Sequence, residues 1–315
     1  MPTSVRPPKR VVSLIASATE IVAALGRLDW LVGRSHECDF PPEVVALPAL
    51  TEAKLEVSGS SADINARVLA IVRDGLSVYR VDPDKLKGVA PDIIVTQDHC
   101  EVCAVSLKDV EEATCSLAGQ SIEIVSLRPN SLEDAFRDMA RVAAALDAGS
   151  QGRALIDRLR GRLDDIRNTA AALPRLGVAF IEWIDPLMSG GNWMPTLIEI
   201  AGGRDLLGVA DAHSPFTSWE SLATADPDVI VVAPCGFDID RTVSEMGVLE
   251  QSGHWSRLRA VRDGRVYIGD GNAFFNRPGP RLVETAEILA EILHPEAFRF
   301  GHEGRGWVRY RGSRV

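Results

Sequence analysis

One long amphipathic segment decides the fold: residues 150–173 read SQGRALIDRLRGRLDDIRNTAAAL. Its apolar residues recur at three- and four-residue steps, which predicts a helix with one apolar stripe. Ser150 is predicted to cap this helix and Pro174 to end it. The helix would be roughly 35 Å long, about the diameter of a small domain. The pattern fits an ordinary surface helix or a strut between two lobes. The stripe consists of Leu155, Leu159, Leu163, Ile166, Ala170 and Leu173.

The sequences on either side of this segment resemble each other. Residues 91–100 read PDIIVTQDHC, and residues 227–236, which begin 227 − 91 = 136 positions later, read PDVIVVAPCG. Each is a short β-branched run, typical of a buried strand, that leads into a loop with a cysteine. A weaker echo pairs ALGR at 24–27 with AGGR at 201–204. Two echoes in the same order favour the strut and indicate two lobes of one architecture.

Predicted strands and helices alternate through both lobes, which indicates an α/β fold with mainly parallel central sheets flanked by helices. The first helix is predicted to start with a capping box, SATE at 17–20. A closing basic stretch rich in glycine reads as loosely ordered. The predicted parts are an N-terminal α/β lobe (1–148), an interlobe helix (149–173), a C-terminal α/β lobe (174–295) and a basic C-terminal tail (296–315).

Composition and charge exclude several classes of function. The 315 residues carry a net charge of −10, and no basic stripe is interleaved with aromatic residues, which argues against nucleic-acid binding. No run approaches the eighteen apolar residues of a membrane span. The first apolar run, 11–15, is too short for a signal-peptide core, so we expect a cytoplasmic protein whose five cysteines are thiols.

In open α/β sheets, ligands gather beyond the carboxyl ends of the strands. The loops predicted at those ends contain aromatic, histidine, cysteine and amide side chains. Flat apolar walls with a few polar anchors suit a large planar ligand. The candidate ligand-binding residues are Ser17, His36, Cys38, Gln97, Asp98, His99, Cys100, Glu182, Trp183, Asn192, Trp193, Cys235, Gly236, Phe237, Phe274, Phe275, Asn276 and Arg277.

The cysteines raise the question of a directly bound metal. Cys100 and Cys103 form a C-x-x-C, and with Cys38, His99 and Cys235 they are candidate ligands for zinc or an iron–sulfur cluster. A single C-x-x-C lacks the second pair of a typical zinc site, and two thiols that pack a loop turn explain it equally well.

Several motifs resemble those of a known family in order and spacing. They are RVVSL at 10–14, ASATE at 16–20, ALG at 24–26, VG at 32–33, CDFPP at 38–42, PDIIV at 91–95, DPDVI at 226–230, VRDGRVY at 261–267 and RPGPRLV at 277–283. They resemble the class III substrate-binding proteins, or helical-backbone metal receptors, and within that family the cobalamin-binding members.

The resemblance implies two lobes joined by one rigid helix, with a cleft between them for a metal chelate such as a corrinoid, haem or siderophore. We expect a cobalamin-like corrinoid, bound without catalysis. A cysteine or histidine of the cleft could be an axial ligand to its metal. The residues expected to flank the macrocycle are Trp183, Trp193, Phe274 and Phe275.

The chain departs from the family in three ways. We expect no export signal and no lipoprotein cysteine, which would argue against a transporter partner. Residues 54–77 look like an insertion. The cysteine-rich loops resemble an intracellular branch of the family. The alternative function is a metal-dependent enzyme in which Cys100, Cys103 and a third thiol hold zinc or an iron–sulfur centre, with Glu182 as base. A metal carrier or sensor could use the same ligands.

Overall fold

The computed structural model describes residues 8–73, 78–98, 107–115 and 121–312. The chain divides into two compact units. The N-terminal unit comprises Met1–Val57, Ala66–Arg128 and Ala135–Ile156. The C-terminal unit comprises Ser58–Asn65, Pro129–Asp134 and Asp157–Val315.

The N-terminal unit is built on a four-stranded sheet with strand order β2-β1-β5-β6. Every pair is parallel, so the carboxyl ends of all four strands lie along one edge. The register places Ser13 beside Val95, which positions the loop after β1 next to the end of β5. The strands are β1 (Val11–Ser13), β2 (Leu31–Arg34), β5 (Ile93–Gln97) and β6 (Glu123–Leu127).

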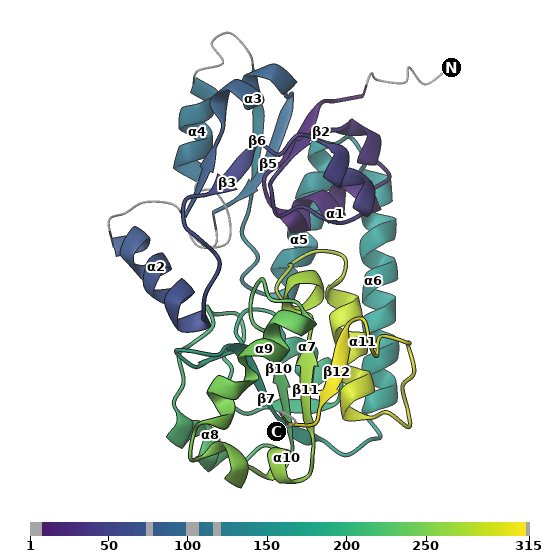
Figure 1. The fold of residues 1–315 in the computed structure, drawn as a ribbon. Coiled ribbons are helices and arrows are strands. Elements are labelled where there is room, and N and C mark those ends of the chain that lie inside the picture. The colour runs from purple at the N-terminus through teal and green to yellow at the C-terminus, as the bar shows by residue number, and fades with distance from the viewer. Residues whose placement is uncertain (1–7, 74–77, 99–106, 116–120, 313–315) are drawn as a thin grey trace. The chain divides into compact units, whose positions relative to one another are not determined.

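Helices cover both faces of this sheet (Figure 1). α3 and α4 contribute Leu86 and Val110 to a core cluster with Val12 and Ile94 of the strands, and Figure 1 shows α1 and α5 on the opposite face. The helices are α1 (Ala16–Ala24), α2 (Ser61–Arg73), α3 (Pro83–Val89), α4 (Leu107–Cys115) and α5 (Leu132–Ala145), with short 3-10 turns at Leu28–Trp30 and Pro42–Ala46 and an antiparallel pair, β3 (Thr51–Ala53) and β4 (Tyr79–Val81).

The C-terminal unit has a six-stranded mixed sheet with strand order β12-β11-β10-β7-β8, and β9 also pairs with β7. The pairs among β9, β7, β10 and β11 are parallel, whereas β8 and β12 run antiparallel to their neighbours. The strands are β7 (Leu176–Trp183), β8 (Met188–Ser189), β9 (Gly203–Asp205), β10 (Val229–Val232), β11 (Val266–Gly269) and β12 (Trp307–Tyr310).

Helices also cover this sheet on both faces. One face packs against α9 and the turns that follow it, in a cluster that includes Met246, Leu249 and Trp255. The helices are α6 (Gly149–Ala170), α7 (Met194–Ile200), α8 (Trp219–Ala225), α9 (Ile239–Glu250), α10 (Arg259–Arg262) and α11 (Leu282–Leu293), with a 3-10 turn at Trp255–Arg257 and a π-helix at Gly271–Phe275.

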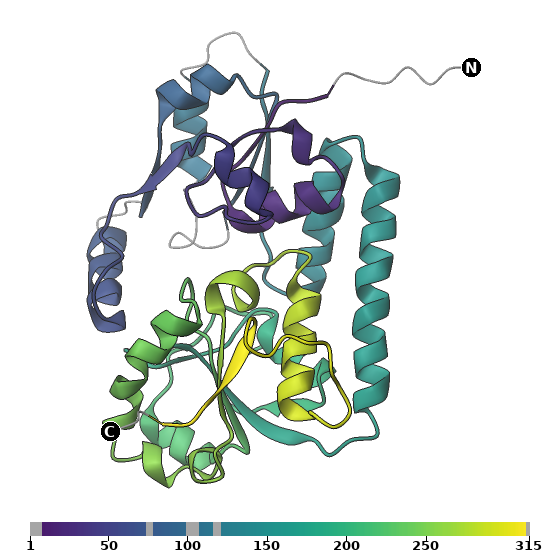
Figure 2. The same ribbon diagram turned by 45° about the vertical axis from the view of Figure 1, so that its right-hand side comes forward.

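The predicted long helix is present as α6, which continues without interruption from one unit into the other (Figure 2). Its apolar stripe is buried from Leu155 to Ala170, as the pattern predicts. The helix begins at Gly149 and ends at Ala170, so Ser150 lies inside it and is not the N-cap.

Two other local predictions are wrong. α1 begins at Ala16, and its N-cap residue Ile15 makes no side-chain cap, so Ser17 lies within the first turn and closes no capping box. The C-terminal tail is ordered: β12 pairs with β11, and the indole nitrogen of Trp307 donates to the buried Glu291 carboxylate at 2.9 Å. Among the described residues, every helix is too short or too polar to cross a bilayer.

Candidate functional site

The carboxyl edge of the C-terminal sheet has an exposed aromatic surface. Trp183, the last residue of β7, is half-exposed, and its ring centre lies 5.3 Å from that of Phe237, in the loop after β10. The Trp183 indole nitrogen donates to the Asp185 carbonyl at 3.0 Å. The Arg241 guanidinium lies 4.5 Å from the centre of the Phe237 ring. We call Trp183 and Phe237 the aromatic pair.

Backbone contacts fix the loop that carries Phe237. The Cys235 amide donates to the Glu182 carbonyl at 3.2 Å, which ties the ends of β10 and β7 together. The Asn272 amide donates to the Phe237 carbonyl at 3.0 Å. A side chain at Gly271 would lie 2.0 Å from the Pro234 carbonyl oxygen, so this close approach requires glycine. The aromatic pair therefore stands on a rigid base.

Three predicted polar residues of this edge make hydrogen bonds within the C-terminal unit. Asn276 donates from its side chain to the Ala233 carbonyl at 3.2 Å and thus braces the end of β10. Arg277 is buried and donates to the Asn272 side chain at 3.0 Å. Glu182 accepts from the Ser214 hydroxyl at 2.7 Å. These contacts make Asn276 and Arg277 parts of the framework.

Three half-buried or exposed residues complete this edge. Asn192 has a left-handed backbone, with φ of 51°, and its buried side-chain oxygen has no partner within the described part of the chain. Cys235 has an exposed thiol, and Gly236, with φ of 77°, forms the turn that follows. Burial raises the pKa of the nearby Asp270, although its carboxylate accepts a hydrogen bond from the Ala273 amide.

Three predicted aromatic residues belong to the core. Phe275 is fully buried and stacks on Phe180 at 5.6 Å between ring centres. Phe274 is buried beside His302. Trp193 is buried and donates from its indole nitrogen to the Phe275 carbonyl at 3.1 Å. In this structure these rings pack inside the C-terminal unit, and their contact with a ligand stays a prediction.

The carboxyl edge of the N-terminal sheet contains buried polar atoms that lack partners. Within the described residues, the Ser17 hydroxyl, the Thr96 hydroxyl and the Gln97 side-chain nitrogen make no hydrogen bond. The loop after β1 lies beside the end of β5, because the Leu14 amide donates to the Val95 carbonyl at 2.9 Å. Each unpaired buried polar group costs about 1–3 kcal/mol, which makes this edge a candidate for contact with a polar ligand group.

The other predicted residues of this unit differ in exposure. His36 hydrogen-bonds the Thr51 hydroxyl through Nδ1 at 2.8 Å, and burial lowers the pKa of its imidazole. Cys38 is buried, and its sulfur accepts from the Thr19 hydroxyl at 3.0 Å. Cys38 is thus buried and packed here, and its role as a metal ligand stays a prediction, because Cys100 and Cys103 lie outside the described residues. Asp98 accepts from Arg128 at 3.1 Å.

The predicted metal ligands His99, Cys100 and Cys103 lie outside the described residues. Among the residues that are described, no three histidine, cysteine, aspartate or glutamate side chains are grouped so as to hold a metal ion. Zinc or iron–sulfur binding therefore stays a prediction that concerns the undescribed segment.

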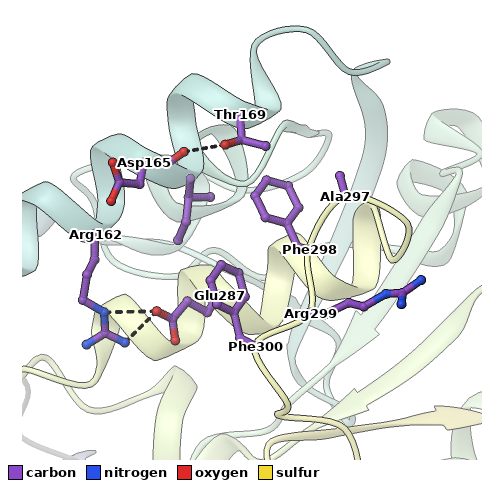
Figure 3. Close-up of a pocket in the computed structure, with 9 residues that line it drawn as sticks. Arg162, Asp165, Thr169, Glu287, Ala297, Phe298, Arg299 and Phe300 are labelled. Carbon is purple, nitrogen blue, oxygen red and sulfur yellow. Dashed lines mark hydrogen bonds and ion pairs between the residues drawn. The ribbon is translucent and has the colours of Figure 1, made fainter.

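A separate hollow of about 290 Å³ lies on the C-terminal unit between α6, α11 and the tail (Figure 3). Figure 3 shows Arg162 paired with Glu287 at its rim, with Nη2 and the carboxylate 2.6 Å apart. The stacked rings of Phe298 and Phe300 form its apolar part. The hollow is below the usual volume of ligand pockets and contains no predicted site residue.

Sequence reasoning missed Arg241 and Ser214, which contact Phe237 and Glu182. The contact of Arg241 with Phe237 could have been predicted from the sequence, because the two residues are four positions apart at the start of a helix, where their side chains can meet. The contact of Ser214 with Glu182 could not, since it spans 32 residues that include β8, α7 and β9, and no single period relates the two positions.

Comparisons with known proteins agree with this architecture. Residues 11–273 match the family described as periplasmic binding protein. A vitamin B12-binding protein of Photorhabdus laumondii is 25% identical, covering 91% of this chain and 88% of its own. An ABC transporter substrate-binding lipoprotein of Bacillus subtilis is 25% identical, covering 93% and 82%.

Solved structures show the same fold at lower identity. A periplasmic heme-binding protein from Pseudomonas aeruginosa has a TM-score of 0.68 at 22% identity, covering 92% of this chain and 94% of its own. The periplasmic vitamin B12-binding protein of Vibrio cholerae has a TM-score of 0.62 at 20% identity, covering 91% and 97%. The chain therefore belongs to the periplasmic binding protein family, in its class III of helical-backbone metal receptors.

Proposed function

We propose that this protein binds a corrinoid, a cobalamin-like metal chelate, without catalysing a reaction. The observation that carries the proposal is the aromatic pair at the carboxyl edge of the C-terminal sheet, in which the half-exposed Trp183 packs against the buried Phe237. A conjugated macrocycle presents a wide flat face, and an aromatic side chain stacks on such a face with a large buried area.

The polar groups of the N-terminal unit favour a corrinoid over a haem. Ser17, Gln97 and the uncapped amides of α1 offer neutral hydrogen-bond donors. The periphery of a corrinoid carries carboxamide groups, whose oxygens accept from neutral donors. Haem carries carboxylates, which are bound best by cationic side chains.

The comparisons support the same ligand class from another direction. Relatives that cover about nine-tenths of this chain are named as vitamin B12-binding proteins. The solved structures include both ligand classes at similar identity, with 22% for a heme-binding protein and 20% for a vitamin B12-binding protein. The names of the sequence relatives favour a corrinoid, and haem is the ligand to test against it.

Calorimetric titration of the purified protein with cyanocobalamin, haemin and a ferric siderophore tests the proposal. We expect one molecule of cyanocobalamin per chain, with a shift in its visible absorbance and weaker binding of the other two. Tighter binding of haemin or siderophore would replace the corrinoid. Stoichiometric zinc or iron by elemental analysis, with no chelate bound, would instead support the metal-dependent enzyme, carrier or sensor.

A further inference from the structure

Arg241 connects the aromatic pair to the segment at residues 58–61, which begins near the start of the predicted insertion. The guanidinium covers the face of the Phe237 ring. Its Nη2 donates to the Gly59 carbonyl and, at 2.9 Å, to the Glu245 carboxylate. Its Nη1 donates to the Ser244 hydroxyl at 3.1 Å. One side chain thus contacts the segment 58–61, the helix α9 and the ligand-facing loop.

Glu245 holds the same segment at a second point. Its carboxylate accepts from the Ser61 amide at 3.2 Å and from the Ser61 hydroxyl at 2.9 Å, and both residues are buried. Ser61 is the first residue of α2, so a carboxylate 184 residues away in sequence caps this helix. The partial positive charge of a helix N-terminus stabilises such an anion.

Local contacts keep the segment in shape. The hydroxyl of Ser60 accepts from the Asp63 amide at 3.2 Å, and the Asp63 carboxylate accepts from the Ser60 amide at 3.0 Å, which is a reciprocal cap. Residues Ser58–Asn65 belong to the C-terminal unit. The segment is therefore built to lie against α9.

We infer that Arg241 is a positioning residue for ligand binding, and that Ser61 and Glu245 hold it over Phe237. The inference rests on the proposed function for the identity of its ligand. With Arg241 in place, Phe237 is fixed between a cation and Trp183, so little side-chain freedom remains to be lost on binding. The segment 58–61 thereby sets the affinity of the C-terminal unit for a planar ligand through its contacts with Arg241 and Glu245.

The test leaves the two rings of the aromatic pair unchanged. Ser61→Ala removes the hydroxyl that donates to Glu245, and Glu245→Gln removes the negative charge and one of the two acceptor oxygens. Arg241→Met removes the charge over Phe237. The control is Ser218→Ala, which removes the N-cap of α8 from the same unit. We expect the first three to weaken cyanocobalamin binding about 3- to 30-fold and the control to leave it unchanged.

A second measurement needs no ligand. In protein labelled with 5-fluorotryptophan, the fluorine resonance of Trp183 is assigned with Trp183→Phe. We expect Ser61→Ala and Glu245→Gln to shift or broaden that resonance, and Ser218→Ala to leave it in place. A purely structural role for the segment would lower the unfolding temperature without moving this signal.

The two measurements separate the inference from the proposed function. If wild-type protein binds no chelate but the Trp183 resonance moves, the positioning role stands and the ligand is wrong. Unchanged affinity in both Ser61→Ala and Glu245→Gln would overturn the inference. A loss of affinity without movement of the resonance would also overturn it, because the effect would bypass the aromatic pair. If Arg241→Met does not fold, Ser61→Ala and Glu245→Gln still test the inference.

Discussion

The rings of Trp183 and Phe237 are tilted by 55° to each other, and they differ in exposure. Phe237 is only 7% exposed and lies beneath Arg241, whereas Trp183 is half-exposed. The pair thus consists of a fixed ring and an accessible one. Because contact with a ligand requires an accessible face, we expect the substitution of Trp183, rather than of Phe237, to remove a direct ligand contact and weaken binding.

We expect Trp183→Ala to weaken corrinoid binding by roughly 1–3 kcal/mol, because the ligand loses a stacked partner and buried area. Absorbance titration measures the change, and a thermal melt shows that the variant is folded. The matched control is Trp30→Ala. Trp30 is half-buried under Arg27 and precedes β2, at the amino end of the N-terminal sheet. Equal affinity of Trp183→Ala and wild type would remove the aromatic pair from the site.

Phe275→Ala should act on stability. Phe275 is fully buried against Phe180, and truncation of such a ring leaves a cavity that costs about 3–5 kcal/mol. Urea unfolding measures the loss. The control is Phe216→Ala, at a ring that is 61% exposed, where we expect a change of at most about 0.5 kcal/mol. A stable Phe275→Ala with weakened ligand binding would restore the original view of Phe275 as a ligand contact.

The comparison of these two rings shows what the sequence could and could not predict. Strand β10 was predicted with its observed bounds, because four consecutive β-branched residues after Pro-Asp leave few alternatives. The side-chain direction at residues 271–276 was not predictable, since this π-helix follows neither a strand nor an α-helix period. Phe274 and Phe275 were therefore assigned to the ligand from their place after a strand.

The C-terminal tail shows a second limit. Its arginines and glycines indicated disorder, yet Trp307 to Tyr310 forms an edge strand beside β11. The buried residues that hold it, Glu287 and Glu291, lie on one helix and meet His302 and Trp307 only after the chain has turned back. Amino-acid composition describes the tail as a whole, so it cannot identify the helix residues that the tail side chains contact.

The ion pair at the tail gives a prediction about pH. Burial alone would raise the pKa of Glu287, but hydrogen bonds from His302 and Arg162 outweigh it, so the pKa lies below its ordinary value. A lowered carboxylate pKa stabilises the folded state above the ordinary glutamate value of about 4.3, and this stability is lost as the pH falls through the lowered pKa. Glu287→Gln should therefore be less stable near neutral pH and respond less to acid below about pH 4.3.

Urea unfolding between pH 3 and pH 7 measures this dependence. The control is Glu296→Gln, whose carboxylate is 94% exposed and pairs with Arg299 at 3.6 Å. We expect the control to follow the wild-type curve, since exposed ion pairs contribute little. Parallel pH curves for Glu287→Gln and wild type would show that the buried carboxylate does not couple the tail to protonation.

Cys38 and Cys235 provide the last prediction. Cys235 is exposed in the loop that carries Phe237, whereas Cys38 is 1% exposed and hydrogen-bonded to Thr19. An accessible thiol ionises and reacts readily, and a buried thiol reacts only when the fold opens. We therefore expect iodoacetamide to alkylate Cys235 well before Cys38, as read from peptide masses.

Saturation with cyanocobalamin should slow the labelling of Cys235, because a ligand stacked on Trp183 would cover the neighbouring strand end. The comparison is internal, since Cys38 in the same sample reports any general change in the opening of the fold. If both cysteines slow equally, the ligand stabilises the whole protein without lying near this loop. If neither changes while the titration shows binding, the loop after β10 lies outside the site. Selective protection of Cys235 alone places the ligand at the carboxyl edge of the C-terminal sheet.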